Sequence, residues 1–203
     1  MDIAIIDYGA GNTANVKNAL AKLGVDVVVT SNSEILQNSD ALVLPGVGSF
    51  GAAIGKLSAG NNMGSLSKLA GQKPFLGICL GMQLLFEESE ESLGVDGFGL
   101  LKGKVKKFTG DLPVPHTGWN KVILSSKNPS PLFDGMGDFY AYFVHSYYCD
   151  PIDRSTISAS TSYGESFPSV ISTKNIFLTQ FHPEKSGVDG LRLLENFVKI
   201  IRR

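Results

Sequence analysis

A cysteine between two glycines is the residue of this sequence best suited to do chemistry. In the run Gly77-Ile78-Cys79-Leu80-Gly81, Cys79 follows an apolar stretch and precedes a helical one. This spacing is that of a nucleophile elbow, in which flanking glycines allow a sharp turn that exposes the nucleophile. The turn also leaves the backbone N–H of Leu80 free to donate to an oxyanion. A buried structural cysteine before a helix is the alternative interpretation.

A nucleophilic cysteine needs a base nearby. At pH 7 an ordinary thiol is only a few per cent ionised, and a helix N-terminus stabilises an anion by only ~0.3–1 kcal/mol. The sequence offers His116, His145 and His182. His182 is the best placed, because it follows the apolar run 176–178. The carboxyl end of a parallel strand is where such sheets bind ligands.

An acidic residue stands two positions after this histidine. Pro183 biases His182 away from the helical conformation. In an extended segment His182 and Glu184 project to the same side. Glu184 can then accept a hydrogen bond from one ring nitrogen and leave the other facing the thiol. A surface His-Pro-Glu loop is the alternative, but together with the elbow the pattern predicts a Cys-His-Glu triad.

A second oxyanion donor is expected after a neighbouring strand. The run Pro45-Gly46-Val47-Gly48 ends a predicted strand, and its glycines let a peptide N–H near Val47 or Gly48 turn at low strain. A plain turn at the end of a strand remains the alternative.

The elements that position these residues alternate through the first hundred positions. Strands are predicted at 2–7, 25–30, 41–44 and 75–78, and helices from a cap at Asn12, around 50–57, around 64–70 and over 80–87. Continuous apolar strands alternating with helices indicate an α/β fold, a doubly wound, mostly parallel sheet with helices on both faces.

After Gly94 the strand signals follow one another with turns between them. They fall at 105–108, 120–124, 139–145, 157–161, 169–172 and 176–181, and several are expected to be antiparallel. An amphipathic helix is predicted over 188–201. We find no linker and no repeat, so residues 1–203 are predicted to form a single domain.

Composition excludes several classes of function. The 203 residues carry 18 Lys and Arg against 19 Asp and Glu, which gives a net charge of −1. This balance does not indicate the basic surface that nucleic-acid binding needs. The apolar stretch 75–86 is too short to cross a membrane, and the chain opens without a cationic leader. Two cysteines make no disulfide framework. We expect a cytoplasmic protein that uses no metal and no cofactor.

Five separated strings of this sequence resemble one family. They are PGVGSFG, GICLGMQLLFEESEE, PHTGWN, YFVHSYY and QFHPEKSG. The second and last are similar to motifs of the class I (triad) glutamine amidotransferases. The others are similar to the glutaminase subunits of imidazole glycerol phosphate synthase. The resemblance runs from the Asp7-Tyr8-Gly9 segment to the last helix, nearly the whole chain.

The resemblance implies a mechanism and a set of roles. Cys79 would attack the side-chain amide of L-glutamine, with His182 as base and then acid and Glu184 orienting it, and a γ-glutamyl thioester would be hydrolysed to glutamate. The backbone of Leu80 and of Val47 or Gly48 would bind the oxyanion. The residues that would hold the substrate are Gln83, His145, Ser146 and Tyr147, while packing is expected for His116.

The resemblance also implies a partner. Ammonia would pass in a heterodimer to a separate (β/α)₈-barrel cyclase subunit that makes imidazole glycerol phosphate for L-histidine biosynthesis. The residues that match the docking surface are Asn12, Asn15, Trp119, Asn120, Tyr142 and Lys185; an ordinary core position is the alternative for Trp119. Thr117 departs from the methionine usual in the family. The PGVG strand is expected to be mis-set in the free chain and corrected when the cyclase holds its ligand.

Three other functions are consistent with parts of the pattern. A class I glutaminase that serves a different synthase would lack the PH-x-GWN and YFVHSY strings. A non-catalytic subunit would keep the fold without the triad. A cysteine peptidase would be expected to carry its own local signatures, which are absent from this sequence.

Overall fold

A nine-stranded mixed sheet runs through the computed structural model, which describes residues 1–60 and 63–203. Its strands are β1 (Asp2–Ile6), β2 (Asp26–Thr30), β3 (Ala41–Gly46), β4 (Phe75–Cys79), β7 (His116–Leu124), β8 (Phe139–His145), β10 (Ile157–Tyr163), β11 (Glu165–Thr173) and β12 (Ile176–Thr179). Their order is β2-β1-β3-β4-β12-β11-β10-β7-β8.

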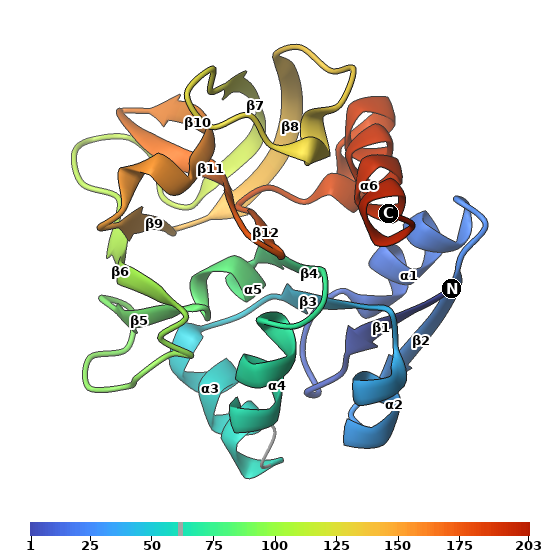
Figure 1. Cartoon of the computed structure of the whole chain (residues 1–203). Helices are drawn as coiled ribbons and strands as arrows, with labels where there is room; N and C mark the ends of the chain where they lie inside the picture. The colour runs from blue at the N-terminus through green and yellow to red at the C-terminus, as the bar shows by residue number, and fades with distance from the viewer. Residues whose placement is uncertain (61–62) are drawn as a thin grey trace.

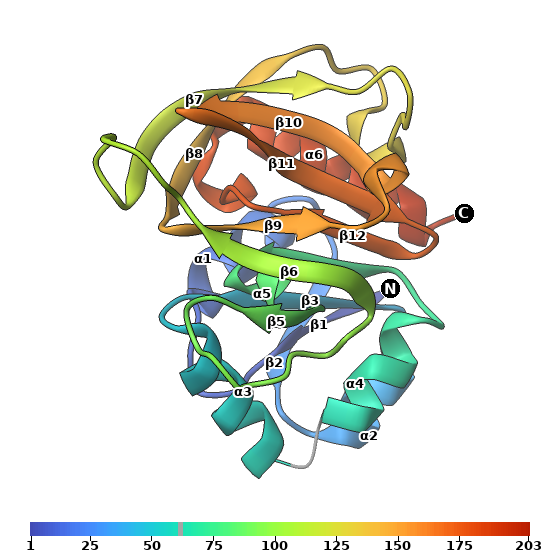
Figure 2. The same ribbon diagram turned by 90° about the vertical axis from the view of Figure 1, so that its left-hand side faces the viewer.

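The sheet changes direction at β12. Strands β2, β1, β3, β4 and β12 are parallel to one another, whereas β11, β10, β7 and β8 pair antiparallel. The predicted α/β class is therefore confirmed, with a parallel first half and an antiparallel second half. Figure 2 shows the antiparallel strands stacked above the parallel ones.

A second, three-stranded sheet lies beside the large one. It consists of β5 (Phe86–Ser89), β6 (Leu101–Lys107) and β9 (Tyr147–Pro151) in the order β5-β6-β9. This small sheet faces the viewer in Figure 2. Strand β9 directly follows β8, so it carries the chain from the edge of the large sheet to the small one.

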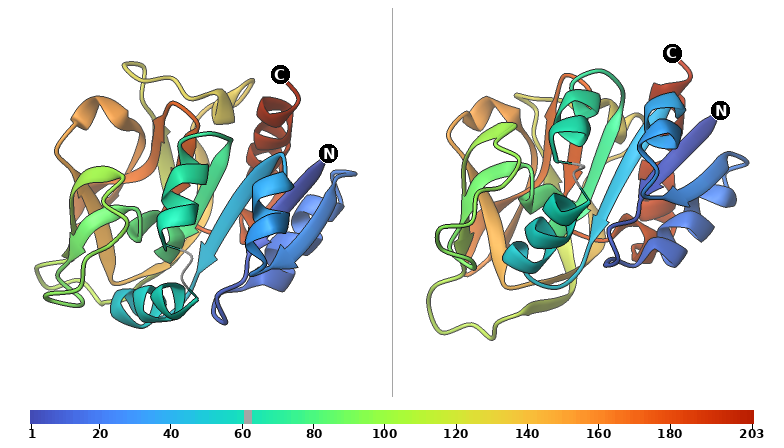
Figure 3. Two further views of the ribbon diagram at one scale, coloured as in Figure 1. Left: turned by 60° about the horizontal axis from the view of Figure 1, so that its bottom comes forward. Right: turned by 90° about the horizontal axis from the view of Figure 1, so that it is seen from below.

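Helices cover both faces of the parallel strands. They are α1 (Thr13–Ala21), α2 (Ser33–Asn38), α3 (Phe50–Ala59), α4 (Met63–Ala70), α5 (Leu80–Gln83) and α6 (Gly187–Ile201), with 3₁₀ turns η1 (Pro131–Phe133), η2 (Arg154–Thr156) and η3 (Pro183–Lys185). Helices α1 and α6 lie together on one face, with α3 and α4 on the other (Figure 1). Seen from below, α2, α3 and α4 lie in front of the parallel strands (Figure 3).

Alternation along β1 explains how two cores form. Ile3 and Ile5 pack into a cluster with α1 and α6, whereas Ala4 and Ile6 pack into the cluster under α3 and α4. Successive side chains of a strand point to opposite faces, so a continuous apolar strand serves both cores. The four N-terminal strands predicted from the sequence are confirmed.

The helix predicted over 80–87 is wrong in length. Helix α5 ends at Gln83, and the chain continues into β5. Leu84, Leu85 and Phe86 are all fully buried, so this run has no polar face for a longer helix to expose. The backbone of this run instead forms hydrogen bonds with the segment that begins at Gly97. A Cβ at Gly97 would overlap the Phe86 carbonyl oxygen. A surface helix alternates apolar and polar residues with a period of about 3.6, and three consecutive buried apolar residues do not fit that spacing.

Two elements lie where none was predicted. Helix α2 is short and polar; Asn32 caps its start, and the Lys73 ammonium donates to three carbonyls at its end, those of Leu36, Gln37 and Ser39. Strand β9 follows β8 after one residue. The last predicted strand, 176–181, ends earlier, at Thr179. Among the described helices, none is long and apolar enough to cross a membrane.

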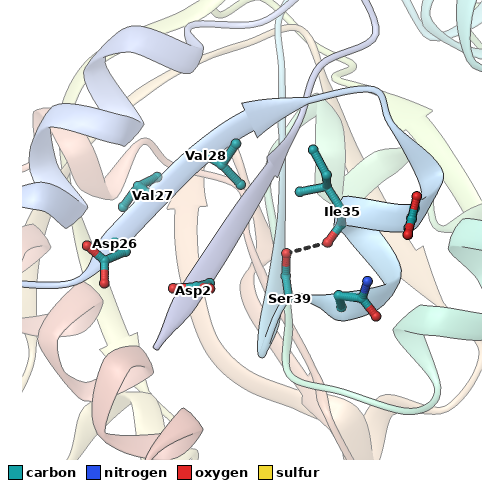
Figure 4. Close-up of a pocket in the computed structure, with 8 residues that line it drawn as sticks. Asp2, Asp26, Val27, Val28, Ile35 and Ser39 are labelled. Carbon is teal, nitrogen blue, oxygen red and sulfur yellow. Dashed lines mark hydrogen bonds between the residues drawn. The ribbon is translucent and has the colours of Figure 1, made fainter.

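A roomy depression lies at the amino ends of β1 and β2. It measures about 520 Å³ and is lined by Asp2, Asp26, Val27, Val28, Ile35 and Ser39, among others (Figure 4). On one wall, the Ser39 hydroxyl donates to the Ile35 carbonyl at the end of α2. None of the predicted site residues lines this depression. They gather instead at the opposite, carboxyl edge of the parallel strands.

Candidate active site

Three adjacent parallel strands end at one pocket. Strands β3, β4 and β12 are neighbours in the sheet, and Val47, Cys79 and His182 lie at or just beyond their carboxyl ends. All three residues line a pocket of about 290 Å³. The carboxyl edge of a doubly wound sheet is where ligands bind. Residues from distant parts of the sequence therefore meet where the topology predicts a site.

The backbone at Cys79 forms a sharp, strained turn. Cys79 has φ 54° and ψ −110°, and within the described chain Lys174 is the other non-glycine residue at positive φ. A residue held in this region costs about 1–3 kcal/mol and marks a functional turn. A Cβ at Gly77 would lie 2.9 Å from the Gly81 carbonyl oxygen, so the turn needs glycine. Cys79 therefore lies in the sharp, glycine-flanked turn between strand and helix that the sequence predicts.

Gly81 is the glycine on which this turn depends most. A Cβ there would overlap the carbonyl oxygen of Leu44 on β3. We expect Gly81→Ala to lower the free energy of unfolding by at least ~3 kcal/mol, measured by urea denaturation, because the backbone has to move. Gly55→Ala is the matched control, since nothing lies near that helical position and alanine is the better helix former. Equal stability of the two variants would contradict this packing.

His182 and Glu184 form a buried pair beside the thiol. The Nδ1 atom of His182 lies 2.9 Å from Oε1 of Glu184, and the side chains are 3% and 1% exposed. The expectation of an extended segment is wrong, because Pro183–Lys185 forms the 3₁₀ turn η3. His182 itself is extended, with φ −97° and ψ 97°, as the following proline predicts. The turn brings the carboxylate back onto the ring.

The other ring nitrogen of His182 is left free by the described residues, beside the pocket that Cys79 also lines. Nε2 is buried and has no well-aligned hydrogen bond among the described residues, although the thiol is close enough to affect it. Burial lowers the pKa of His182, but interaction with Cys79 and Glu184 outweighs burial and raises it to about 10. The raised pKa means that the ring holds a proton firmly, which favours the state in which the Cys79 proton has moved to His182. The thiol donates at present to the Val144 carbonyl, with the sulfur 3.8 Å from the oxygen.

Backbone groups suited to an oxyanion belong to two segments that line the pocket with Cys79. Leu80 begins α5, so its N–H has no partner in the helix. Val47 is 46% exposed, and Gly48 has φ 97°. Just before them the Tyr8 hydroxyl donates to the Pro45 carbonyl at 3.2 Å. The strand is therefore held at Pro45, whereas the Val47–Gly48 peptide lies in an exposed segment.

The four residues expected to hold a substrate all line the pocket. They are Gln83, His145, Ser146 and Tyr147. Gln83 is 4% exposed and donates to the Tyr147 carbonyl at 2.9 Å, so this side chain is already oriented by the protein. Ser146 and Tyr147 are half-buried.

His145 forms a hydrogen-bonded pair with His116. The Nδ1 atom of His116 lies 3.0 Å from Nε2 of His145, and Nδ1 of His145 lies 2.8 Å from the Tyr147 carbonyl oxygen. A carbonyl only accepts, so His145 must carry its proton on Nδ1, and His116 must then donate from its own Nδ1. Burial lowers the pKa of both rings, that of His145 to about 3.

This geometry predicts the protonation of both rings. From about pH 5 to pH 8, the range over which an ordinary histidine titrates, we expect His145 to stay neutral with the proton on Nδ1, and His116 to titrate below the ordinary histidine midpoint. Long-range ¹H–¹⁵N spectra of the histidine rings measure this directly. An Nε2–H tautomer at His145, or a midpoint near 6.5 for either ring, would contradict the hydrogen bonds described here.

Other pocket residues are not apparent from the sequence motifs. Glu91 lines the pocket, and its Oε2 accepts from the Phe50 N–H at the start of α3 at 2.6 Å. Pro115 and Val144 complete the wall. Gln180 is fully buried next to Cys79. The acidic run 87–91 and the glutamine before FHPE were visible signals, but only the fold shows which of these side chains reach the pocket.

Most of the residues predicted to dock a partner lie around η3, whereas Asn120 points to the other face of β7. Trp119 is 58% exposed, so it is not a core tryptophan. Its ring lies 6.3 Å from that of Tyr142, and the Lys185 ammonium lies 5.8 Å from the Tyr142 ring. Asn12 and Asn15 belong to the start of α1, which contacts η3. Asn120 donates to the Ser162 carbonyl at 2.9 Å.

Comparison with known proteins agrees with this geometry. The family described as "Glutamine amidotransferase class-I" matches residues 4–201. The fold is that of a solved glutamine amidotransferase, with a TM-score of 0.78 at 19% identity over 99% of both chains. The solved structure of PurLQS from Thermotoga maritima gives a TM-score of 0.76 at 19% identity over 98% of both chains. The chain belongs to the class I glutamine amidotransferases.

Curated relatives narrow this assignment. The chain is 50% identical to "Imidazole glycerol phosphate synthase subunit HisH" of Methanothermobacter thermautotrophicus, over 98% of this chain and 99% of the relative. It is 45% identical to the protein of the same name from Bacillus subtilis, over 98% and 96%. Within the class it belongs to the HisH family of imidazole glycerol phosphate synthase subunits.

Proposed function

We propose that this chain, as one glutaminase domain, hydrolyses L-glutamine to glutamate and ammonia in the cytoplasm. The ammonia passes to the cyclase subunit of imidazole glycerol phosphate synthase, its partner in a heterodimer for L-histidine biosynthesis. One observation carries the proposal: His182, whose Nδ1 lies 2.9 Å from Oε1 of Glu184, lines the same pocket of about 290 Å³ as Cys79.

The first half of the reaction forms a thioester. The Cys79 proton moves from its present contact with the Val144 carbonyl to Nε2 of His182, and the thiolate attacks the side-chain amide carbon of glutamine. Negative charge develops on the amide oxygen, where the N–H groups of Leu80 and of Val47 or Gly48 donate. The C–N bond then breaks, and the imidazolium gives its proton to the departing nitrogen, which leaves as ammonia.

The second half hydrolyses the thioester. His182 removes a proton from water, which attacks the acyl carbon, and the same N–H groups stabilise the second oxyanion. The thiolate leaves and regains its proton, so the chain returns to its starting state with glutamate released. Glu184 stays ionised and keeps Nδ1 of His182 as a donor throughout.

The walls of the pocket suit the amino-acid end of glutamine. Glu91 offers a carboxylate to the substrate ammonium; its Oε2 is held by the Phe50 N–H, which leaves Oε1 for the ligand. Ser146 and the backbone around Tyr147 can hold the substrate carboxylate. A pocket of this size suits a free amino acid better than a peptide chain.

The exposed aromatic cluster suits a partner. Trp119 and Tyr142 are of the aromatic types that are enriched at protein interfaces, and the Lys185 ammonium lies beside the Tyr142 ring. These residues lie around η3, which carries Glu184, so a bound cyclase would sit next to the triad. Ammonia released there has a short path to a second active site. Thr117, where relatives are expected to have methionine, is exposed on the same hairpin.

The oxyanion strand offers a way for the partner to control the rate. Tyr8 holds the Pro45 carbonyl, whereas Val47 and Gly48 are exposed and the two glycines around Val47 permit a peptide flip. We infer that the cyclase with its nucleotide ligand favours the orientation in which this N–H faces the pocket. A coupling of 1–3 kcal/mol, typical between sites, corresponds to roughly 5–150-fold in affinity.

A glutaminase assay with and without the partner tests the proposal. The chain is mixed with the cyclase subunit from its own source, with and without its nucleotide ligand, and glutamate release is followed. We expect the loaded complex to be at least roughly fivefold faster than the isolated chain. Equal rates would contradict control by the partner, and no glutamate in any mixture would contradict the glutaminase assignment.

A further inference from the structure

A fully buried glutamine contacts the sulfur of Cys79. Gln180 follows β12, and its Nε2 lies 3.8 Å from Sγ of Cys79. Its Oε1 lies 3.2 Å from Nε2 of Gln83. The mechanism given above uses the thiol, His182 and the backbone N–H groups, and it leaves this amide without a part.

The orientation of this amide is settled by its neighbours. An amide oxygen and nitrogen have the same shape, so their assignment depends on the partners. The Tyr147 carbonyl can only accept, so the Gln83 atom at 2.9 Å from it must be Nε2. That same nitrogen donates its second hydrogen to Gln180, whose near atom must then be oxygen. The N–H₂ group of Gln180 is therefore the end that faces the sulfur.

The carbonyl that fixes this orientation is itself held in place. Tyr147 accepts from Nδ1 of His145 at 2.8 Å as well as from Gln83. His145 is held in turn by His116, whose Nε2 lies 3.2 Å from the Asn120 amide nitrogen. Because the Tyr147 carbonyl oxygen has no hydrogen to give, the polarity of each further link between the neutral rings follows from it.

We propose that Gln180 is a further catalytic residue, whose amide N–H donates to the Cys79 sulfur and favours its ionised form during turnover. Gln83 is the positioning residue that keeps this donor aimed at the sulfur. This inference deepens, and rests on, the proposed glutaminase mechanism.

The contacts of the sulfur explain why such a donor matters. The thiol gives its hydrogen to the Val144 carbonyl, but a thiolate facing that oxygen meets a partial negative charge. His182 supplies a positive charge after it has accepted the proton, and Gln180 supplies a neutral donor that is present before and after. A hydrogen bond to a charged group is stronger than one to a neutral group, so the contact favours the thiolate over the thiol.

Alkylation of Cys79 by iodoacetamide at neutral pH tests this without using glutamine. In Gln180→Met, which has a similar length and no donor, we expect alkylation roughly fivefold to tenfold slower than in the unchanged chain. The kcat for glutamate release falls by a similar factor while KM stays within about twofold. Thr179→Val is the matched control: it removes a buried hydrogen bond one residue away, to the Phe181 carbonyl, and is expected to alkylate at the normal rate.

Two results would overturn the proposal. One is an alkylation rate for Gln180→Met equal to that of the unchanged chain, and the other is equal slowing in Thr179→Val, which would indicate general loosening. If Gln180→Met does not fold, Gln83→Met is measured instead, and an unchanged rate there would equally overturn it. A chain that alkylates as described but releases no glutamate would refute the proposed function alone, so the two failures are distinguishable.

Discussion

Cys79→Ala is expected to lower kcat for glutamate release by at least ~10⁴-fold in the complex with the cyclase, the size of loss seen when a covalent nucleophile is removed. The reason is that attack on a side-chain amide needs an anion placed against both oxyanion donors and His182. Among the described residues that line this pocket, Cys79 is the only cysteine, and it ends β4. Enzyme-coupled detection of glutamate measures the loss.

The second cysteine provides the matched control. Cys149 is fully buried on β9, and burial, together with the nearby Cys79 and Asp150, raises the pKa of its thiol. It should remain a protonated packing residue, so Cys149→Ala should keep kcat within about threefold, with a loss of stability of ~1–2 kcal/mol. If Cys149→Ala were the inactive variant and Cys79→Ala the active one, the assignment of the nucleophile would be wrong.

The second large effect is expected at the carboxylate behind His182. We expect Glu184→Gln to lower kcat by ~10³-fold, because an amide can present N–H to Nδ1 and turn the ring to the wrong tautomer. The unchanged carboxylate accepts from Nδ1 at 2.9 Å and also stabilises the imidazolium that forms. Its other oxygen is buried without a partner among the described residues, which is a costly arrangement for a polar atom.

An exposed glutamate gives the comparison. Glu195 on α6 pairs with Lys199 one turn away at 3.1 Å, and both side chains are about half exposed. Because surface ion pairs contribute ~0–1 kcal/mol, Glu195→Gln is expected to change neither kcat nor stability appreciably. A Glu184→Gln variant as active as Glu195→Gln would show that His182 does not depend on its carboxylate.

Much of the fold follows from local sequence signals. The alternation of apolar strands with capped helices before Gly94 identifies the parallel half, and strands at 139–145 and a helix near 188–201 lie where they were predicted. Helix α5 could not be bounded in this way, because its end depends on pairing of 84–89 with the segment after Gly97. Strand β9 was missed because no turn signal separates it from β8.

Site residues that belong to one sequence motif could be predicted. Those that reach the pocket only through long-range folding could not. The roles of Cys79 and of the His-Pro-Glu run were predicted from the spacing of their own residues. The two motifs lie close together because β4 and β12 are neighbouring strands. Glu91 reaches the pocket from a loop after β5, and its neighbours in sequence do not. Gln180 gains its contact with the sulfur only through long-range packing against Gln83.

The most direct test of the central claim is to identify the covalent intermediate. The chain, loaded with cyclase and nucleotide, is mixed with L-glutamine, quenched in acid within one turnover, digested and analysed by mass spectrometry. The account predicts a γ-glutamyl group on the peptide that contains Cys79, lost on treatment with hydroxylamine and absent from Cys79→Ala. Glutamate formed at the normal rate with the acyl group on another residue, or on none, would contradict it.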